Sequence, residues 1–587
     1  MKHCISLLLW AITTLSSSAS AASWKGDGSA DNPYLVETAA QLQELAGQVN
    51  SGNDCKGTIF RLTSDIDLRN VCGEGIGDWT PIGSIEHYFE GTLLGDGHTI
   101  RNLFIQDAKT SYVGLFGYIG RYGTVSGITI QDGLVNSSFW TGAIAGGNSG
   151  QILDCHNINC EVESYQFGGG IAGGNFNTIN NCSNNATISS SLGTGGICGY
   201  NYGNTSNSNN TGEIYGRNGT GGICGYNGGF SSHSNCYNVK IGIIQNCHNL
   251  AYVSGGKKTG GITGRNDGFI LNSFNKGELS GKIDIGGIAG YNGGFDGTIG
   301  RINNSYNIGD ISCTEEPAGG IVGTNNEAGE IANVYNTGKT FALGSNGNIA
   351  GKNNGQINYC FRWDSISNNE VGSNYGYIYE SFTFHKEVNI CTLSRNMDNT
   401  TDLSSALNLW TQNQTDSLFL CWSNDSAKEY TNKGFPILNS ATKQLHNILV
   451  HSFHGETIAN TYIAPEGTTV SVIIIPEENH KLSNIVATIG DMEIPTTIND
   501  NVLTLTMPDG DVSIYLYWDN IPSSTSTIEL YTEQNTVHVI SDSDHEILVF
   551  SVDGRLLKKM KAKANIEKTF RLNQGMYLIN GIEVYIK

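Results

Sequence analysis

The sequence is poor in positive charge and in long apolar runs. Its 587 residues include 33 Lys and Arg against 54 Asp and Glu, which gives a formal net charge of -21 and a pI near 5.0. This balance disfavours nucleic acid and anionic membrane surfaces as partners, because both are themselves negatively charged. After residue 21 no apolar run is long enough to span a bilayer. We therefore expect no nucleic-acid partner and no membrane span in the mature chain.

Sequence signatures of common catalytic and metal-binding sites are also missing. The chain has no CxxC pair, no HExxH and no GxSxG, and no stretch with the GxxxxGKS or GxxxxGKT spacing of a phosphate loop. Charged residues make up only 15% of the chain. We predict no metal, no cofactor and, as the leading hypothesis, no enzymatic activity.

The first 21 residues resemble a secretory signal peptide. Lys2 supplies the positive end, residues 5–15 form a short apolar core, and Ala19, Ser20 and Ala21 form a small-residue cleavage site. We predict that the protein is exported, and that it is secreted or held at the cell surface.

Cysteine usage does not follow the pattern of a disulfide framework. Of 14 cysteines, Cys4 lies in the signal peptide and leaves an odd number. Four others share one repeat position, where further copies carry Ser or Val: Cys155, Cys182, Cys247 and Cys360, against Ser208, Ser273, Ser305 and Val334. A position that accepts these residue types is a small interior slot, so we expect free thiols there.

What the chain has in abundance is glycine, in a heptapeptide that recurs. Its form is GGIAGYN, and its central aliphatic residue falls at Leu115, Ile144, Ile171, Ile197, Ile223, Ile262, Ile288, Ile321 and Ile349. The shortest spacing is 26 residues, and longer spacings contain polar, Gly-rich insertions. No unit can bury its aliphatic residue alone, but units stacked in register can. We predict an all-β fold, a parallel β-solenoid (β-helix) of about nine coils, roughly 43 Å long at the ~4.8 Å spacing of parallel strands.

Asparagine ends the heptapeptide in each of the eight later copies and is assigned a structural role. These copies carry Asn148, Asn175, Asn201, Asn227, Asn266, Asn292, Asn325 and Asn353. Asparagine tolerates left-handed corners, and stacked copies can hydrogen-bond to one another. His156 and His248 also share a repeat position, but they stand three coils apart, roughly 14 Å, too far to share a metal.

The remaining segments start, close and follow the array. After the signal peptide at 1–21, residues 22–105 form an N-terminal capping region with one helix, because Thr38 and Gln41 form a capping box before an apolar stripe at Leu42, Leu45, Ala46 and Val49. The array spans 106–362, and a closing segment at 363–445 contains a short helix in LSSALNLWTQN. Two small β domains follow, at 446–520 and 524–587, with a Ser/Thr linker at 523–526.

The array and its lead-in resemble the GLUG-motif repeat family of exported bacterial adhesin-like proteins. The resemblance covers roughly 24–438 and rests on DNPY at Asp31, DIDL at Asp65, WTPIG at Trp79, GDGHTIRNL at Gly95 and GLFG at Gly114. It implies an exported protein of the cell surface, and we find no separate catalytic domain of the kind that some members carry.

Both C-terminal domains carry resemblances of their own. Residues 446–518 look like internalin-type bacterial repeat modules, through APEGTTVSV and MPDGDVSIYLYW. Residues 544–587 look like the sorting domains of type IX secretion, through ILVFSVDGRLLKK, LNQGMYLI and the terminal lysine. The second resemblance implies that the secretion machinery is a partner and that the protein lies on the extracellular side of a Gram-negative bacterium.

The sixth place of the heptapeptide is the candidate binding site. Consecutive copies carry Tyr200, Tyr226, Arg265 and Tyr291, followed by Thr324 and Lys352. Tolerance of Arg and Lys predicts that this line faces solvent. Tyrosines with an interleaved arginine can stack on sugar rings or anchor a protein partner. The alternative is that stacked aromatics only stiffen the surface of the coil.

A second line of residues carries the enzymatic alternative. Glu278 and Asp310 take one position of adjacent coils, Lys339 takes it in the next, and Glu213 lies two coils earlier. Two neighbouring carboxylates can hold calcium or divide acid and base roles. The competing interpretation is a solvated edge. Our leading hypothesis is thus a non-enzymatic adhesin-like rod that binds a glycan or an extracellular or host-surface protein. The alternatives are a polysaccharide-acting β-solenoid enzyme and a spacer that presents the 446–520 module.

Overall fold

The computed structural model describes residues 24–106, 109–228, 242–294, 299–363, 369–385, 390–392 and 400–412, with shorter stretches from 414 to 586. The predicted signal peptide and the linker at 523–526 lie outside the described residues. The chain forms two compact units, Met1–Leu445 and His446–Lys587. We describe each unit by itself.

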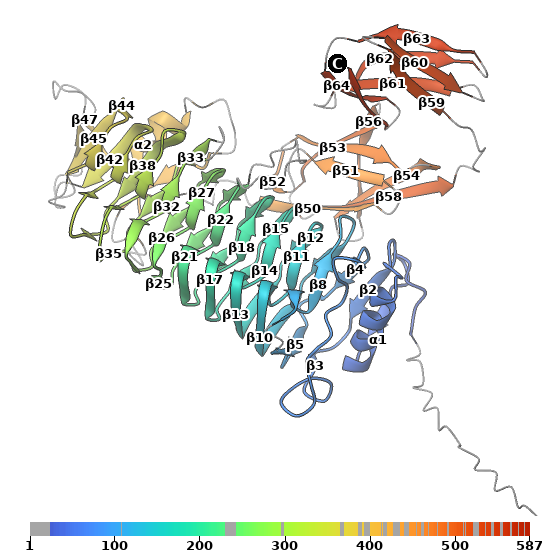
Figure 1. Cartoon of the computed structure of the whole chain (residues 1–587), viewed down its shortest axis with the longest axis horizontal. Helices are drawn as coiled ribbons and strands as arrows, with labels where there is room; N and C mark the ends of the chain where they lie inside the picture. The colour runs from blue at the N-terminus through green and yellow to red at the C-terminus, as the bar shows by residue number, and fades with distance from the viewer. Residues whose placement is uncertain are drawn as a thin grey trace, which may run out of the picture. The chain divides into compact units, whose positions relative to one another are not determined.

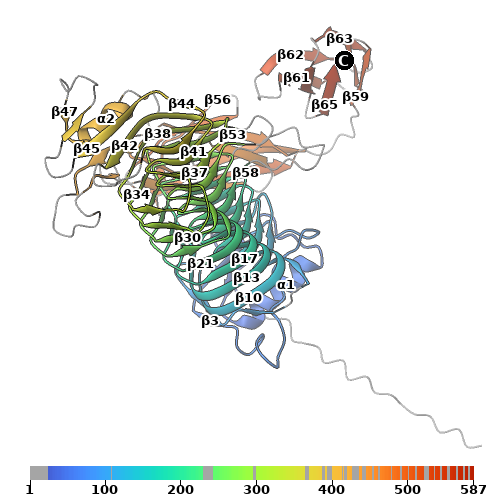
Figure 2. The same ribbon diagram turned by 60° about the vertical axis from the view of Figure 1, so that its left-hand side comes forward.

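The first unit is a parallel β-solenoid, and its coils stack along one axis (Figures 1 and 2). The heptapeptides form one sheet of ten parallel strands in the order of the chain. These strands are β8 (Phe116–Ile119), β11 (Ala145–Asn148), β14 (Ala172–Asn175), β18 (Cys198–Asn201), β22 (Cys224–Asn227), β27 (Thr263–Asn266), β32 (Ala289–Asn292), β37 (Val322–Asn325), β41 (Ala350–Asn353) and β43 (Val371–Asn374). The predicted fold class is confirmed.

The other sides of the coils belong to a second sheet of 37 strands. One row of parallel neighbours comprises β1 (Tyr34–Val36), β2 (Ile59–Leu62), β4 (Thr92–Leu94), β9 (Thr124–Ser126), β12 (Gln151–Leu153), β15 (Thr178–Asn180), β19 (Asn204–Ser206), β23 (Ile243–Gln245), β28 (Phe269–Leu271), β33 (Gly300–Asn303), β38 (Gly329–Asn336), β42 (Gln356–Trp363) and β44 (Tyr377–Ile378). The row begins inside the predicted capping region, so that region supplies coils as well as a cap.

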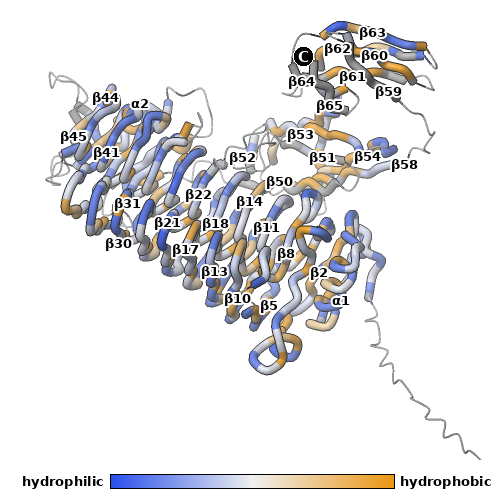
Figure 3. Tube along the Cα trace, in the orientation of Figure 1, coloured by the Kyte–Doolittle hydropathy of each residue, from blue (hydrophilic) through white to orange (hydrophobic). Residues whose placement is uncertain are grey.

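The strands that lead from this row back to the next heptapeptide are short in the first coils, longest in β10 and β13, and short again in the later coils. The early ones are β3 (Ile66–Asp67), β5 (Thr99–Arg101), β6 (Phe104–Ile105), β7 (Ser111–Val113), β10 (Thr129–Gly142), β13 (His156–Gly169), β17 (Ile188–Gly195) and β21 (Ile214–Gly221). The later ones are β25 (Val253–Ser254), β26 (Lys257–Gly260), β30 (Leu279–Gly281), β31 (Ile283–Gly286), β35 (Ile311–Cys313), β36 (Ala318–Gly319), β39 (Thr340–Phe341) and β40 (Asn346–Gly347). Figure 3 shows hydrophobic and hydrophilic stretches alternating along the coils.

The core is a column of aliphatic side chains that runs the length of the array. All nine central residues of the heptapeptides are fully buried in one hydrophobic cluster. Their backbones are also linked, for example by the Ile171 N–H, which donates to the Ile197 carbonyl over 2.9 Å. Each coil therefore depends on the next one for both its apolar contacts and its hydrogen bonds.

The array extends one coil beyond its predicted end at 362. Strand β43 pairs in parallel with β41, joining Val371 to Ala350 and Asn374 to Asn353. Its heptapeptide is degenerate, because Glu370 stands where earlier coils carry Ile, and the Ile349 N–H donates to the Glu370 carbonyl. A polar residue in the last place ends the apolar column, as a terminal coil requires.

Asparagine forms the predicted ladder. Each of the eight side-chain amides donates to the side-chain oxygen of the asparagine in the next coil over 2.8 or 2.9 Å, and the last acceptor is Asn374. A second ladder was not predicted. It joins Asn184, Asn210, Asn249, Asn275, Asn307 and Asn336 over 2.8 Å, through β16 (Ser183–Asn184), β20 (Asn209–Asn210), β24 (His248–Asn249), β29 (Phe274–Asn275) and β34 (Tyr306–Asn307).

The predicted N-terminal helix is confirmed as α1 (Ala39–Asn50). Thr38 caps it, and the side-chain oxygen of Gln41 accepts a hydrogen bond from the Thr38 N–H, which completes the predicted capping box. Its buried side chains, Leu42, Leu45, Ala46 and Val49, join the core cluster. Helix α1 therefore covers the apolar end of the first coils.

The closing segment also contains its predicted helix, α2 (Leu403–Gln412). It packs against the side of the last coils, where Tyr306, Tyr335 and Phe361 share a cluster with Trp422 and Phe435. Strands β45 (Ser381–His385), β46 (Ile390–Thr392) and β47 (Thr400–Thr401) pair in antiparallel order beyond the coils, and β48 (Trp422–Ser423) pairs with β49 (Ile437–Leu438). Helix α2 of this segment thus covers a side of the last coils, and β46 pairs with the free edge of β45.

The second unit contains the two predicted small β domains. In the first, a five-stranded sheet and a four-stranded sheet contribute to one core. The strands are β50 (Leu445–Ser452), β51 (Gly455–Ala459), β52 (Ile463–Pro465), β53 (Thr469–Pro476), β54 (His480–Ile489), β55 (Met492–Ile494), β56 (Thr497–Asn499), β57 (Val502–Thr506) and β58 (Val512–Asn520).

The second small domain combines a three-stranded and a four-stranded antiparallel sheet around its own core. The strands are β59 (Ile528–Glu533), β60 (Thr536–Ser541), β61 (His545–Ser551), β62 (Leu556–Ala562), β63 (Lys568–Arg571), β64 (Gly575–Ile579) and β65 (Ile582–Ile586).

Candidate functional site

The sixth place of the heptapeptide forms one continuous line along the ten-stranded sheet. Tyr200, Tyr226, Arg265 and Tyr291 are direct register partners in β18, β22, β27 and β32. The predicted alignment is therefore present. The predicted exposure is wrong at two of these positions, because Tyr200 is 4% exposed and Arg265 is 5% exposed.

Tyr200 is buried because side chains from neighbouring corners close over it. Tyr202 stacks on its ring at 4.3 Å, and Phe167 meets the ring edge-on at 5.5 Å. Its hydroxyl donates a hydrogen bond to the Gly228 carbonyl over 3.2 Å. The corners were not part of the sequence pattern, so the pattern alone overestimated the exposure of the line.

These corners and the sixth place together form a row of aromatic rings, which we call the aromatic belt: Tyr112, Tyr118, Trp140, Phe167, Phe176, Tyr200, Tyr202 and Tyr226. All but Tyr200 are half-buried, and none belongs to the main core cluster. The rings form two stacks. Tyr112, Trp140 and Phe167 form one, with planes 3° and 23° apart, and the remaining five rings form the other. The two stacks meet at larger angles, such as 71° between Phe167 and Tyr200. Within each stack, the faces of the inner rings are therefore covered by neighbouring rings.

Glycines in the sixth place make room for this belt. In the coils that carry Gly147 and Gly174, the sixth place has no side chain. A Cβ added at Gly147 would lie 2.6 Å from the Tyr118 ring, and one at Gly174 would lie 2.7 Å from the Trp140 ring. Glycine in the sixth place of these two coils is thus a packing feature.

Three rings of the belt stand on strained backbone. Tyr112, Trp140 and Phe167 have φ values of 60°, 56° and 60°, at a corner where the next two coils carry Gly193 and Gly219 with φ of 67° and 68°. A left-handed conformation costs a residue with a side chain roughly 1–2 kcal/mol. The following two coils carry Lys258 and Asp284 at this corner, with φ of 54° and 56°, so the left-handed conformation is a property of the corner in each of these coils. The belt places aromatic residues in this conformation, and strain of this kind is a pointer to function.

Towards the C-terminal coils the same face becomes ionic. Arg265 Nε lies 2.7 Å from Asp267 Oδ2, and Lys258 Nζ lies 4.8 Å from the centre of the Tyr291 ring. Burial raises the pKa of Asp267 to about 6, and burial lowers the pKa of Lys258 below its ordinary value. Asp284 accepts a hydrogen bond from Thr324 over 2.6 Å, and burial raises its pKa as well. The charges on this part of the face are internally paired.

The carboxylate line is present, but it is open to solvent. Glu278, Asp310 and Lys339 take equivalent positions in adjacent coils, because the residues that follow them pair with one another in register. All three side chains are exposed. The backbone N–H of Lys339 donates to Asp310 Oδ1 over 2.8 Å. The three residues thus form a solvated edge, which is the competing interpretation given above for this line.

The two histidines stand three coils apart, as predicted. Ser183 and Asn209 take the intervening positions. His156 Nδ1 lies 2.8 Å from the Ser183 hydroxyl, while His248 stacks on Phe274 at 4.8 Å. Burial lowers the pKa of His248 to about 4, so that its ring is neutral at physiological pH. Among the residues that the structure describes, no group of His, Cys, Asp and Glu is placed to hold a metal ion.

The shared cysteine position is the interior slot that the sequence indicated. Cys155, Cys182, Cys247 and Cys360 are buried and free. Their thiols donate to carbonyl oxygens two residues earlier, as the Ser208 hydroxyl does in its coil.

Comparison with known proteins finds likeness over short segments. No family model matches the chain. A "Putative Gly-rich membrane protein" of Evansella cellulosilytica is 34% identical over 140 residues, which is 23% of this chain and 15% of that protein. Halomucin of Haloquadratum walsbyi is 29% identical over 153 residues, 25% of this chain and 2% of halomucin. The chain thus spans only a small part of either relative.

One solved structure shows a distant likeness. It is the crystal structure of "a putative immunoglobulin A1 protease from Bacteroides ovatus", which is 18% identical, covers 70% of this chain and 94% of its own, and has a TM-score of 0.31. A likeness this weak carries no functional argument. In the described part of the chain, neither helix has the length and apolarity that crossing a bilayer requires.

Proposed function

We propose that this protein is an exported, non-enzymatic rod of the cell surface or extracellular space, and that its aromatic belt binds a partner protein. The observation that carries the proposal is the strained, half-exposed set of Tyr112, Trp140 and Phe167 outside the core. The names of both sequence relatives, a Gly-rich membrane protein and halomucin, support an extracellular or surface location. The signal-peptide pattern and the resemblances to GLUG repeats and to type IX sorting domains support export from a Gram-negative cell.

The stacking of the belt favours a protein over a glycan. A sugar binds an aromatic ring through the face of the ring, but within each stack of the belt the faces of the inner rings are covered by other rings. Exposed ring edges and tyrosine hydroxyls suit T-shaped contacts with aromatic side chains and hydrogen bonds to a partner backbone. Tyrosine and tryptophan are also frequent anchors of protein interfaces.

The enzymatic alternative has less support. Glu278 and Asp310 lie on an exposed edge and not in an enclosed site. If sugar-releasing activity were found, replacing both by Ala would show whether it depends on this pair.

The fold itself offers a replacement that tests the belt. Trp140→Gly and Phe167→Gly install the residue that later coils carry at the same corner, Gly193 and Gly219. The double variant therefore removes two rings and relieves strain, so it should fold. A matched control replaces Tyr377 and Tyr379, which are exposed on the last coil, by Ser.

The assay is binding of the full chain to an array of extracellular-matrix proteins, with a glycan array in parallel. We expect the double glycine variant to lose affinity for the bound protein roughly thirtyfold, which corresponds to about 1 kcal/mol for each of the two rings. The control variant should bind like the unmodified chain. Unchanged binding by the glycine variant, or binding to glycans alone through the belt, would overturn the proposal.

A further inference from the structure

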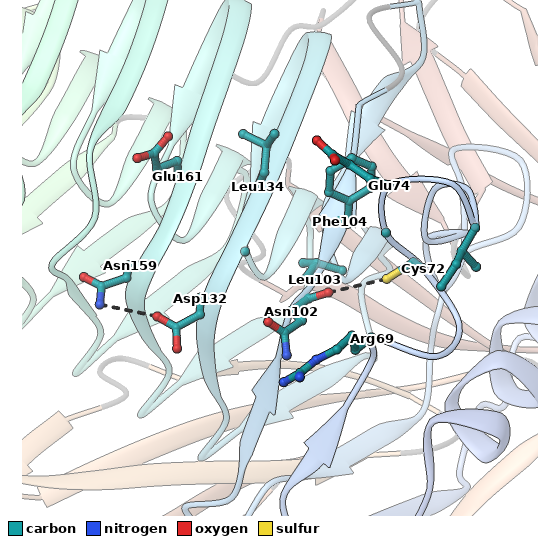
Figure 4. Close-up of a pocket in the computed structure, with 13 residues that line it drawn as sticks. Arg69, Cys72, Glu74, Asn102, Leu103, Phe104, Asp132, Leu134, Asn159 and Glu161 are labelled. Atoms are coloured by element: carbon teal, nitrogen blue, oxygen red, sulfur yellow. Dashed lines mark hydrogen bonds between the residues drawn. The ribbon is translucent and has the colours of Figure 1, made fainter.

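A separate hollow lies beside the first coils, away from the heptapeptide sheet (Figure 4). Its volume is about 530 Å³, and it is bounded on one side by the loop that carries Glu74 and Ile76. The floor is formed by β6, β10 and β13 and the corners next to them. Figure 4 shows two rows of side chains that run along the axis across neighbouring coils.

The first row is polar and repeats once per coil. Asn102, Asp132 and Asn159 stand at equivalent corners with φ of 60°, 52° and 55°, a conformation that Asn and Asp tolerate better than other residues. Asn159 Nδ2 donates to Asp132 Oδ1 over 3.4 Å. Because parallel strands lie ~4.8 Å apart, the row offers hydrogen-bonding groups at that interval along the rod.

The second row begins apolar and ends acidic. Phe104, Leu134 and Glu161 are register partners in β6, β10 and β13. Phe104 and Leu134 are half-buried, and Ile76, 57% exposed, faces the same hollow from the loop. The hollow thus combines apolar surface with convergent polar groups, as small-ligand sites do.

The charge of the hollow restricts what it can take. Glu74, Asp132 and Glu161 contribute three carboxylates. The guanidinium of Arg69 also lines the hollow, but its Nη2 lies 3.0 Å from Asp67 Oδ2 in an ion pair. The excess of negative charge repels acidic polymers and favours neutral or cationic ones.

We infer that this hollow binds an extended glycan built of neutral or amino sugars, lying along the rod axis. In the first row, the carboxylate accepts hydrogen bonds from sugar hydroxyls and the amide N–H groups donate hydrogen bonds to them. Each coil contacts one sugar residue. Phe104 and Leu134 meet the apolar face of the sugar ring. The site involves none of the rings of the aromatic belt, so it stands independently of the proposed protein partner.

Residues from neighbouring coils supply variants that the fold accepts. Asp132→Asn installs the residue that the next coil carries at the same corner, Asn159. Glu161→Thr introduces the residue type that the next coil carries at the equivalent position. That residue is Thr187, because Val162 pairs with Ile188. The control is Asp310→Asn, because Asp310 lies on the same register line several coils away from the hollow.

The experiment measures binding of oligosaccharides to the full chain by calorimetry. The probes are oligomers of glucosamine, N-acetylglucosamine and galacturonic acid, with polylysine as a basic peptide. We expect the two hexosamine oligomers to bind and the acidic oligomer not to bind. The Asp132→Asn, Glu161→Thr double variant should lose affinity at least roughly tenfold, while Asp310→Asn should not. Absence of binding, binding of galacturonate or polylysine alone, or an unaffected double variant would overturn the inference.

Discussion

Replacing one hydrogen-bond donor of the asparagine ladder by an acceptor should destabilise the neighbouring coils of the rod. Asn201 is fully buried, and its amide donates to Asn227 Oδ1 over 2.8 Å and to the Ile243 carbonyl over 3.1 Å. Its oxygen accepts from Asn175 over 2.9 Å. Asn201→Asp keeps the shape of the side chain, so no cavity forms, but it removes both donated hydrogen bonds and sets an oxygen against the Asn227 oxygen.

The structure allows an estimate of the cost. Leaving a buried acceptor without its donor costs roughly 1–3 kcal/mol, and two acceptors lose one here, so we expect a local destabilisation of about 4 kcal/mol. A buried, ionised carboxylate adds to this cost. Protonation restores one donor, so the defect should shrink at acidic pH.

Hydrogen exchange measured by mass spectrometry is the suitable assay, because repeat arrays open locally rather than all at once. Amides of β14, β18 and β22 should exchange roughly a thousandfold faster in the variant. The control is Asn374→Asp at the exposed end of the ladder, where the oxygen can still accept from Asn353. There we expect a change within about 0.5 kcal/mol. Equal effects of the two variants would show that the ladder does not stabilise the interior coils.

Three further predictions concern pH, thiols and the N-terminal cap. Burial raises the pKa of Asp267 from 3.8 to about 6. Its contribution to the free energy of unfolding is therefore present below about pH 4 and is lost as the pH rises through 6, a loss of about 3 kcal/mol. Urea unfolding at two pH values should show this loss in the unmodified chain but not in Asp267→Asn, and the same loss in both proteins would contradict the prediction. Cys421 is exposed and should react with a maleimide in the native protein. Cys160 and Cys247 should not react, because burial raises the pKa of each of these two thiols to about 12. Peptide mapping that finds all three cysteines labelled alike would refute this prediction. Thr38→Ala should destabilise α1 by about 1 kcal/mol, seen as faster amide exchange, while Thr38→Ser should not.

Residues that repeat in the sequence were predicted well, and residues at the corners between repeats were not. The Ile column and the first asparagine ladder each follow from a local pattern whose partner is an identical pattern in the next coil. The cap of α1 follows from two residues of its own segment, Thr38 and Gln41. The last coil was missed because Glu370 replaces the diagnostic Ile, although Asn374 was a remaining signal. The second asparagine ladder had a signal in the recurring half-motif that ends in asparagine, as in INNCSN and ILNSFN.

The candidate site was predicted only in part. Register alone places Tyr200, Tyr226, Arg265 and Tyr291 on one line, but their exposure depends on side chains from other positions. Trp140 and Phe167 precede the heptapeptide by two residues and vary from coil to coil, so no repeat pattern marks them. The ion pair between Arg265 and Asp267 likewise joins two positions that are unremarkable in sequence.

The sequence by itself determined that the chain stacks on itself, because a 26-residue unit with so few aliphatic residues can bury them only against a copy of itself. It also determined which places form the interior, because they must stay the same from coil to coil. Only the tertiary structure decided which outward places remain accessible and which of them converge in a hollow. Exposure is set by side chains that reach over from corners of neighbouring coils, and the hollow at Asp132 and Glu161 exists only because a loop from an earlier coil stands beside them.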